Sequence, residues 1–287
     1  MDDVAAWVGR RSTAQAWLDP AQADRMNATL DREPGFRPGD ELPPAWHWLY
    51  FFDTVRAGEL GPQGHPRLGL RLPPVGLPRR MWAGGTLTFH RPLLLATTVE
   101  QVSTIRAVTA KRGRSGPLVF VTVEHVLREL GPEVDDDGGT GDAALVEEQT
   151  IVYRPAPTPD ADTSAPDSAP APGEAAFTRS WALDGVALFR YSALTFNGHR
   201  IHYDADYCRD VEGYPGLVVH GPLLATLLLD LAAGHGRPLG RFSYTARSPL
   251  FLPEPFTVNG RPDGDATRMW VTGPDGLTAM QAQAQPR

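Results

Sequence analysis

The feature that most limits how this chain can fold is an apolar stretch from Leu217 to Ala233. It holds about 17 residues and contains His220, Pro222 and Asp230, whereas a membrane-spanning helix needs ~20 apolar residues with few or no charges. The stretch therefore predicts a buried helix rather than a membrane span, and we expect no contact with a membrane. The rest of the chain has to supply the elements that bury this helix.

Segments typical of short antiparallel strands lie on both sides of this helix. β-Branched or alternating runs separated by turn signals occur at 87–89, 97–102, 105–110, 118–127, 145–153, 177–181, 241–247, 256–261, 268–272 and 277–283. Apolar residues at roughly helical spacing predict a helix over residues 3–32, with Asp19 and Pro20 as a start signal. Residues 60–80 are rich in Gly and Pro and are expected to form an irregular loop.

A change of composition divides the chain into two parts. Six prolines lie between Pro155 and Pro172, among Ala, Asp, Ser and Thr. Such a segment cannot bury enough apolar surface to offset the entropy lost on ordering. We therefore expect a linker over residues 155–176 that separates residues 1–154 from residues 177–287. Both parts carry a predicted sheet, and only the second carries a clear long buried helix.

The charge and the cysteine content exclude several classes of function. The formal net charge is −7 and no basic stripe with interleaved aromatic residues occurs, so we expect no nucleic-acid partner. Cys208 is the only cysteine, which rules out an intrachain disulfide and is compatible with a reducing compartment. The sequence opens with Met-Asp-Asp and lacks the basic start and apolar run of a signal peptide, so a cytoplasmic location is expected.

Charged and polar residues crowd into residues 191–204, directly before the apolar helix. Asn197 and His202 are five positions apart there, so both side chains could face one water molecule across a loop or a single turn. Histidine is the usual general base near neutral pH, because its unperturbed pKa is about 6.5, and an asparagine amide can hold and orient a water. From the spacing alone, a polar loop whose histidine and asparagine merely cap the next helix is the better interpretation.

Two other chemistries are open to the same segment with less support. His199 and His202, with Asp204 or Asp206, have a permissible spacing for a metal, yet structural zinc sites usually show a clearer set of cysteine and histidine ligands. We therefore expect no metal. A nucleophilic role for Cys208 has no partner implied by the sequence, and a lone cysteine is more often a small buried residue.

The start of the apolar helix offers a second functional group. The first-turn N–H groups of a helix have no internal partner, and they can stabilise a developing oxyanion, which the helix dipole also favours. Gly221, directly after His220, would let a carbonyl oxygen approach closely because it has no side chain. An ordinary Gly-Pro helix start explains the same residues equally well on this evidence alone.

Together these two segments resemble the MaoC-like (R)-specific enoyl-thioester hydratases and dehydratases. The motif of that family runs from an aromatic residue through Gly-Asp-x-Asn-Pro to an aliphatic residue and His, and a His-Gly pair at a helix start follows downstream. In this chain Tyr191 matches the aromatic residue, Ile201 and His202 match the aliphatic-His pair, and His220 and Gly221 match the helix start.

Three positions depart from that motif, because Asn197 stands where the family has its Asp, His199 where it has Asn and Arg200 where it has Pro. This version resembles the branch that includes 3-methylfumaryl-CoA (mesaconyl-C4-CoA) hydratases and the mitochondrial-type hydroxyacyl-thioester dehydratases. The resemblance is specific over about residues 185–235 and diffuse elsewhere.

The resemblance implies an α+β fold, a double hot dog in which two curved antiparallel sheets are each wrapped on a helix. Residues 1–154 would form a degenerate N-terminal hot-dog domain, and residues 177–287 would form the catalytic one. The acyl chain or the pantetheine arm would lie between them. Hot-dog proteins usually pair, so either a homodimer or a pseudo-dimeric monomer is expected.

The implied activity is that of a hydro-lyase, which adds water to an α,β-unsaturated acyl-CoA or dehydrates the 3-hydroxy form. His202 is the expected base, Asn197 holds the water, and the Gly221 N–H binds the thioester oxygen. We expect the substrate to contact five further residues, namely Tyr191, His199, Arg200, His220 and Arg247. Coenzyme A enters as part of the substrate, and no separate cofactor is expected.

Three interpretations of the substrate and role stay open. The acyl group can be dicarboxylic, as in mesaconyl-C4-CoA, which gives citramalyl-CoA and needs a cation for its distal carboxylate. It can instead be a 3-hydroxyacyl chain on acyl carrier protein, which needs an apolar tunnel and indicates fatty-acid or polyketide synthesis. The missing Asp of the motif also allows a non-catalytic acyl-thioester-binding module, against which the retained His202 and Gly221 argue.

Overall fold

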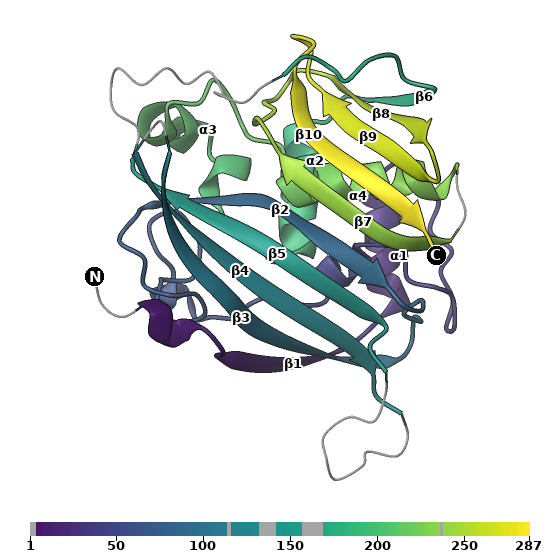
Figure 1. Cartoon of the computed structure of the whole chain (residues 1–287), viewed down its shortest axis with the longest axis horizontal. Coiled ribbons are helices and arrows are strands. Elements are labelled where there is room, and N and C mark those ends of the chain that lie inside the picture. The colour runs from purple at the N-terminus through teal and green to yellow at the C-terminus, as the bar shows by residue number, and fades with distance from the viewer. Residues whose placement is uncertain (1–3, 114–115, 132–141, 157–168, 236–237) are drawn as a thin grey trace.

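The computed structural model of the chain describes residues 4–113, 116–131, 142–156, 169–235 and 238–287. Its strands form one antiparallel sheet, which runs diagonally across Figure 1 in the order β1-β3-β4-β5-β2-β7-β10-β9-β8-β6. The bounds are β1 (Arg11–Trp17), β2 (Arg79–Phe89), β3 (Thr98–Gly113), β4 (Gly116–Glu129), β5 (Leu145–Arg154), β6 (Phe177–Trp181), β7 (Leu239–Ala246), β8 (Phe256–Asp263), β9 (Ala266–Thr272) and β10 (Thr278–Pro286).

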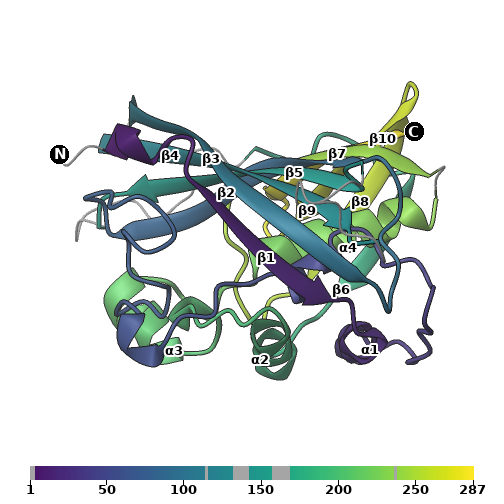
Figure 2. The same cartoon turned by 90° about the horizontal axis from the view of Figure 1, so that it is seen from below.

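The helices gather on one side of this sheet, as Figure 2 shows. They are α1 (Pro20–Thr29), α2 (Gly185–Leu194), α3 (Ala205–Tyr207) and α4 (Gly221–Ala233). Single turns of 3-10 helix lie at Val4–Trp7, Trp46–Leu49, Ala57–Glu59 and Arg200–His202, and a π-helical turn spans Cys208–Glu212. Among these helices, α4 packs directly on the second half of the sheet, against β7, β8, β9 and β10.

Helix α4 confirms the buried helix expected from the apolar stretch. Nine of its 13 residues are buried. It begins at Gly221 rather than at the start of the apolar stretch, because His220 is extended and Val219 N–H donates to the carbonyl of Leu250 at 2.9 Å. Within the described ranges, no helix is both long enough and apolar enough to cross a bilayer.

The two halves of the sheet repeat the same strand order. The series β1-β3-β4-β5-β2 from the first part of the chain corresponds, strand for strand, to β6-β8-β9-β10-β7 from the second. The halves join where β2 pairs with β7, from Gly84 opposite Thr245 to Thr88 opposite Arg241. Strand β5 ends at Arg154 and β6 begins at Phe177. Residues 157–168 of the expected linker lie outside the described residues.

The seam between β2 and β7 is unusually close, and glycine permits it. A Cβ at Gly85 would lie 2.5 Å from the Tyr244 hydroxyl and 2.5 Å from the carbonyl of Glu148. A bulge between Trp82 and Gly84 interrupts the pairing of β2 with β5. The Trp82 ring stacks on Tyr244 across the seam, with centroids 4.5 Å apart. The seam therefore places an aromatic wall from both halves beside the start of α4.

Three predictions of local structure are wrong. Residues 3–32 are not one helix, because β1 occupies Arg11–Trp17 and only α1, which begins after Asp19 as expected, is α-helical. Residues 191–204, for which the spacing alone favoured a polar loop, begin with the last turn of α2. The expected strands at 97–102 and 105–110 are one strand, β3, with an irregularity between Ile105 and Ala107.

Candidate active site

His202 occupies the last position of the short turn Arg200–His202, which follows α2. Its Nδ1 lies 2.7 Å from the backbone carbonyl of Val218, so Nδ1–H donates there and Nε2 is left as a proton acceptor. Burial lowers the pKa of His202 to about 4, because a desolvated site disfavours the charged form. The imidazole is therefore neutral at physiological pH and able to take a proton.

His220 lies directly against His202. The two rings stack with centroids 3.6 Å apart and planes 17° apart. The Nε2 atom of His220 is 2.8 Å from the Ser192 hydroxyl on α2, and its Nδ1 is buried without a partner among the described residues. Burial and the neighbouring imidazoles of His202 and His199 lower the pKa of His220 well below its usual range. The stacked pair therefore favours two neutral rings and fixes the orientation of His202.

His199 brings a third imidazole to the same place. Its ring is perpendicular to that of His202 at a centroid distance of 5.6 Å, and it contacts the ring of His65 at 4.2 Å. Burial, His202 and the positive charge of Arg80 lower the pKa of His199 to about 3. His65 and Arg80 come from the first half of the chain, so the site combines both halves.

Asn197 begins the histidine loop, residues 197–202, which carries His199 and His202. Its side-chain Oδ1 accepts a hydrogen bond from the backbone N–H of His199 at 3.0 Å. Its backbone N–H donates to the carbonyl of Ser192 at 2.8 Å. The side-chain oxygen is thus used in holding the loop, as in an Asx turn. Among the described residues the Nδ2 amide makes no hydrogen bond, so it remains available as a donor.

Gly221 is the first residue of α4, and Trp82 covers it. A Cβ at Gly221 would lie 2.9 Å from Cε3 of Trp82. The N–H groups of Gly221 and Leu223 donate to no described carbonyl, and Pro222 between them has no N–H. A free N–H at a helix start, beside a neutral histidine, provides a donor for an oxygen that gains negative charge.

The buried carboxylate of Glu147 holds Trp48, which packs against Trp82 in the aromatic wall. Trp48 meets Trp82 edge-on at 5.6 Å, and its Nε1 donates to Oε2 of Glu147 at 3.0 Å. The same carboxylate oxygen lies 2.9 Å from Nε2 of His47. Hydrogen bonds and the charge of His47 hold the pKa of Glu147 below its usual range in spite of complete burial. Trp48, Tyr244 and Gly221 thus fix the position of Trp82.

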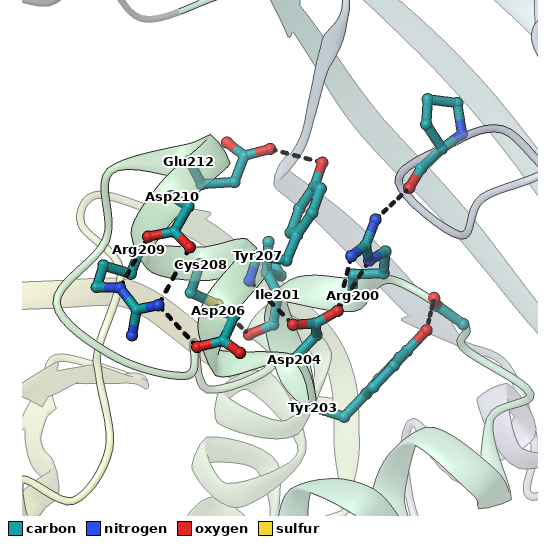
Figure 3. A network of polar contacts seen from close by, with 12 residues as sticks. Arg200, Ile201, Tyr203, Asp204, Asp206, Tyr207, Cys208, Arg209, Asp210 and Glu212 are labelled. Carbon is teal, nitrogen blue, oxygen red and sulfur yellow. Dashed lines mark hydrogen bonds and ion pairs between the residues drawn. The ribbon is translucent and has the colours of Figure 1, made fainter.

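Arg200 is already engaged by neighbouring protein groups, including the carbonyl of Pro62 at 3.3 Å, as Figure 3 shows. Its Nε and Nη2 donate to Oδ2 of Asp204 at 3.0 and 2.8 Å, and its guanidinium lies over the Tyr207 ring at 4.2 Å. The expected contact of Arg200 with substrate therefore has to compete with these partners. Arg247 is exposed and donates to Gln281 at 3.2 Å; no described contact joins it to the histidines.

Tyr191 is placed behind the histidines rather than among them. Its ring is 2% exposed and meets His220 edge-on at 4.8 Å, so it packs against the side of His220 and presents little surface to a ligand. Cys208 is buried, and its thiol donates to the carbonyl of Ile201 at 3.2 Å. Burial raises the pKa of Cys208 to about 11, which is unfavourable for a thiolate nucleophile.

The site also has members that the sequence did not reveal. Trp82, His65 and Arg80 were not singled out, because they lie more than 100 residues before the motif in parts of the chain without a motif of their own. Residues 43–52 are rich in aromatic side chains and include Trp48, which contacts Trp82, but this stretch gives no signal for Trp82, His65 or Arg80 themselves. In the described part of the chain, no group of three His, Cys, Asp or Glu side chains is arranged to hold a metal ion.

The arrangement defines a class of protein. A sheet built of two equivalent halves covers one buried helix, whose first turn carries a free N–H next to a neutral histidine. Such a pair can polarise a thioester carbonyl and move a proton to or from its neighbouring carbons. The chain belongs to the hydroxyacyl-thioester dehydratase type 2 family, whose model matches residues 45–252. It is accordingly a hydro-lyase that acts on acyl thioesters.

Similar proteins agree in sequence and in fold. The chain is 43% identical to the mesaconyl-C(4)-CoA hydratase of Chloroflexus aurantiacus, over 99% of this chain and 98% of that protein. A MaoC-like dehydratase from Phytophthora capsici shares the fold with a TM-score of 0.69 at 11% identity, over 99% and 98% of the two chains. A Mycobacterium tuberculosis protein with a double hotdog fold matches with a TM-score of 0.59 at 12% identity, over 96% and 95%. The expected double hot-dog fold is confirmed.

Proposed function

We propose that this enzyme hydrates a coenzyme A monothioester of a butenedioic acid, and that mesaconyl-C4-CoA, which would give citramalyl-CoA, is the first candidate. The support for this substrate is the whole-length identity of 43% to a mesaconyl-C(4)-CoA hydratase. The observation that carries the chemistry is the neutral His202, whose Nδ1 is held by the Val218 carbonyl at 2.7 Å.

The first step in this proposal is polarisation of the thioester. The carbonyl oxygen accepts a hydrogen bond from the Gly221 N–H, which the helix dipole of α4 strengthens. Electron density then moves from the carbon–carbon double bond toward the carbonyl, and the β-carbon becomes electrophilic. Trp82 covers Gly221 closely, which supports a flat acyl group lying against the indole.

The second step is the addition of water. Nδ2 of Asn197 donates to the water oxygen, and Nε2 of His202 takes one water proton while the oxygen bonds to the β-carbon. The α-carbon then receives a proton from His202, which restores the neutral imidazole and completes a syn addition. Asn197 carries no proton in this scheme, because its amide does not ionise near neutral pH. Dehydration is the same sequence reversed.

The test of this scheme is His202→Ala, assayed by the loss of enoyl-thioester absorbance. Loss of a general base in such a site costs about 10²–10⁴ in rate, so turnover should fall at least ~100-fold while circular dichroism stays native. His90→Ala, at an exposed histidine, is the matched control and should keep full activity. Near-normal turnover by His202→Ala would remove the proposed base.

A second substrate class is favoured by the family match itself. The family is named for hydroxyacyl-thioester dehydratases, so we also propose a 3-hydroxyacyl group on acyl carrier protein as the alternative. The same three residues would serve it. A panel of C4 to C8 enoyl-CoA esters, with and without a distal carboxylate, separates the two. Preference for long neutral chains would favour the carrier-protein substrate, and binding without turnover would favour a non-catalytic module.

The cofactor requirement, the cellular location and the oligomeric state of the protein are also proposals. We infer that the reaction needs no cofactor or metal beyond coenzyme A in the substrate, because His202 and Gly221 supply proton transfer and carbonyl polarisation. Activity that survives exhaustive dialysis against a chelator is the expected result. A cytoplasmic location and a homodimer remain proposals, which fractionation of cells and light scattering would test.

A further inference from the structure

We propose that Arg80 binds the free carboxylate of the substrate and so makes the enzyme selective for acyl groups that carry an anion on the carbon that receives water. This inference rests on the proposed hydratase function. It assigns to the first half of the chain the part of the site that recognises the acyl group, while the second half supplies the reacting groups.

Arg80 is the second residue of β2 and is half-buried. Because side chains alternate along a strand, Arg80 faces the same side of β2 as Trp82, about 7 Å away along the strand. Trp82 covers Gly221, the proposed donor to the thioester oxygen. A short acyl group that begins at Gly221 and lies along Trp82 would therefore extend toward Arg80.

The loop before β2 is folded against the histidine loop and fixes this end of the site. Gly64 packs so closely on Gly198 that a side chain could not be accommodated. The backbone N–H of Arg200 donates to the carbonyl of Gln63 at 3.0 Å. These contacts bring the His65 ring to 4.2 Å from that of His199. Burial is the main cause of the lowered pKa values of both imidazoles, and the charge of Arg80 lowers them further.

Arg80 has no acidic partner among the described residues, unlike Arg79 and Arg200 nearby. Arg79 pairs with Glu212 at 2.7 Å, and Arg200 pairs with Asp204 at 2.8 Å. A half-buried cation without a counter-ion loses hydration and gains no ion pair in return. Arg80 therefore contributes little to stability on its own, and a carboxylate that arrives with the substrate would complete the pair.

The chemistry of a butenedioate monothioester places that carboxylate at the required position. Its second carboxyl group is attached directly to the β-carbon, the atom attacked by the water that His202 deprotonates. The anion thus lies beside the reacting carbon, on the side away from the thioester. The planar guanidinium can bind both carboxylate oxygens at once. The neutral His65 and His199 add no competing charge, so the field at this end of the site is positive.

A matched pair of substrates isolates the carboxylate. Crotonyl-CoA and the fumaric acid monothioester of coenzyme A differ only by a methyl group in place of the carboxylate. Removing one partner of a buried charge pair costs a factor of roughly 30 to 5,000, so Arg80→Gln should lower kcat/KM for the fumaryl thioester by a factor in that range. It should leave kcat/KM for crotonyl-CoA nearly unchanged. Arg80→Lys should recover part of the loss, because it keeps the charge without the fork.

Two controls separate this inference from the fold and from the proposed function. Arg268→Gln removes the same charge from an exposed position on β9 and should change neither substrate. Binding of the unreactive analogues succinyl-CoA and butyryl-CoA needs no turnover, and Arg80→Gln should weaken only succinyl-CoA. Wild-type protein that hydrates neither enoyl thioester would overturn the proposed function. Equal losses on both members of each pair, or no loss on either, would overturn the assignment of Arg80.

Discussion

At the scale of single residues, the proposed mechanism depends on His202, which burial keeps neutral. A general base acts only when deprotonated, so activity rises with pH through its pKa and is level above it. Burial lowers the pKa of His202 to about 4. We expect kcat/KM to stay level down to about pH 5 and to fall through about pH 4, and a pH–rate profile measures this. An acid limb centred near 6.5, the usual histidine value, would contradict it.

Protein stability has to be followed in the same pH window. Complete or partial burial disfavours the charged form of five histidines and lowers their pKa values below the usual range; they are His65, His125, His199, His202 and His220. Between the folded and the unfolded pKa, the unfolded chain binds more protons, so the free energy of unfolding decreases as pH falls from about 6.5 toward 4. Recovery of full activity after return to pH 7 distinguishes protonation of the base from unfolding.

A single methyl group at Gly221 tests the close packing of the helix start. In Gly221→Ala the new Cβ would lie 2.9 Å from Trp82, whose ring is held by Tyr244 and Trp48. Overpacking of this kind costs about 1–3 kcal/mol, and displacement of the indole should also lower kcat. Trp82→Leu added to Gly221→Ala should recover stability without recovering turnover. Unchanged melting and turnover in Gly221→Ala would refute this account.

The sequence singles out candidate residues that lie close together in the chain, and the roles given to them stay predictions. Asn197, His202 and Gly221 fall within a single stretch that resembles a motif, and the structure places His202 and Gly221 at adjoining ends of a loop and a helix. The sequence alone could not show that the side-chain oxygen of Asn197 accepts a hydrogen bond from the His199 N–H, because the loop geometry decides that contact. Arg80 and Trp82 carry no local signal, since only strand pairing brings them to the site.

At the scale of secondary-structure elements, one ion pair fastens β2 to the segment after the histidine loop. Arg79 and Glu212 are 2.7 Å apart, with side chains 13% and 9% exposed, and Glu212 also accepts from Tyr207 at 3.2 Å (Figure 3). Removing one member of a buried pair costs about 3–5 kcal/mol, so Glu212→Gln should unfold at a clearly lower denaturant concentration.

The control for this pair lies a few residues away. Arg209 and Asp206 also form an ion pair, at 2.7 Å, but their side chains are 64% and 80% exposed. Exposed pairs contribute little because water screens them, so Asp206→Asn should leave the unfolding curve unchanged. The double variant Arg79→Met with Glu212→Leu should be more stable than Glu212→Gln, because neither charge is then buried alone. Equal stability of Glu212→Gln and Asp206→Asn would show that burial does not matter here.

The elements that sequence patterns missed have a physical reason in common. Strand β1 is an edge strand with mostly exposed residues, so it lacks the apolar alternation by which strands are recognised, and only its pairing with β3 defines it. Helix α2 has buried residues at Leu188, Tyr191 and Leu194, one helical turn apart. The polar residues that follow Leu194 mask that period in the sequence. The strands of the second half, with clear turns between them, were predicted correctly.

At the scale of the whole molecule, the two halves form one sheet and one site. Their strand orders correspond element by element. No repeat is visible in the sequence, because equivalent positions in a sheet require only the same alternation and not the same residues. The pairing of β2 with β7 gives one chain the arrangement of a pseudo-dimer. The first half lacks the histidine motif but contributes Trp82 and His65 next to it.

Separation of the halves is therefore expected to abolish activity. Residues 169–287 alone would expose the edge of β7 that now pairs with β2, and an unpaired edge favours aggregation. They would also lack Trp82 and the Arg79 partner of Glu212. Coexpression of residues 1–156 with residues 169–287 should restore soluble protein and turnover, because the seam does not need the linker. An isolated second half with wild-type turnover would show instead that the first half is dispensable for catalysis.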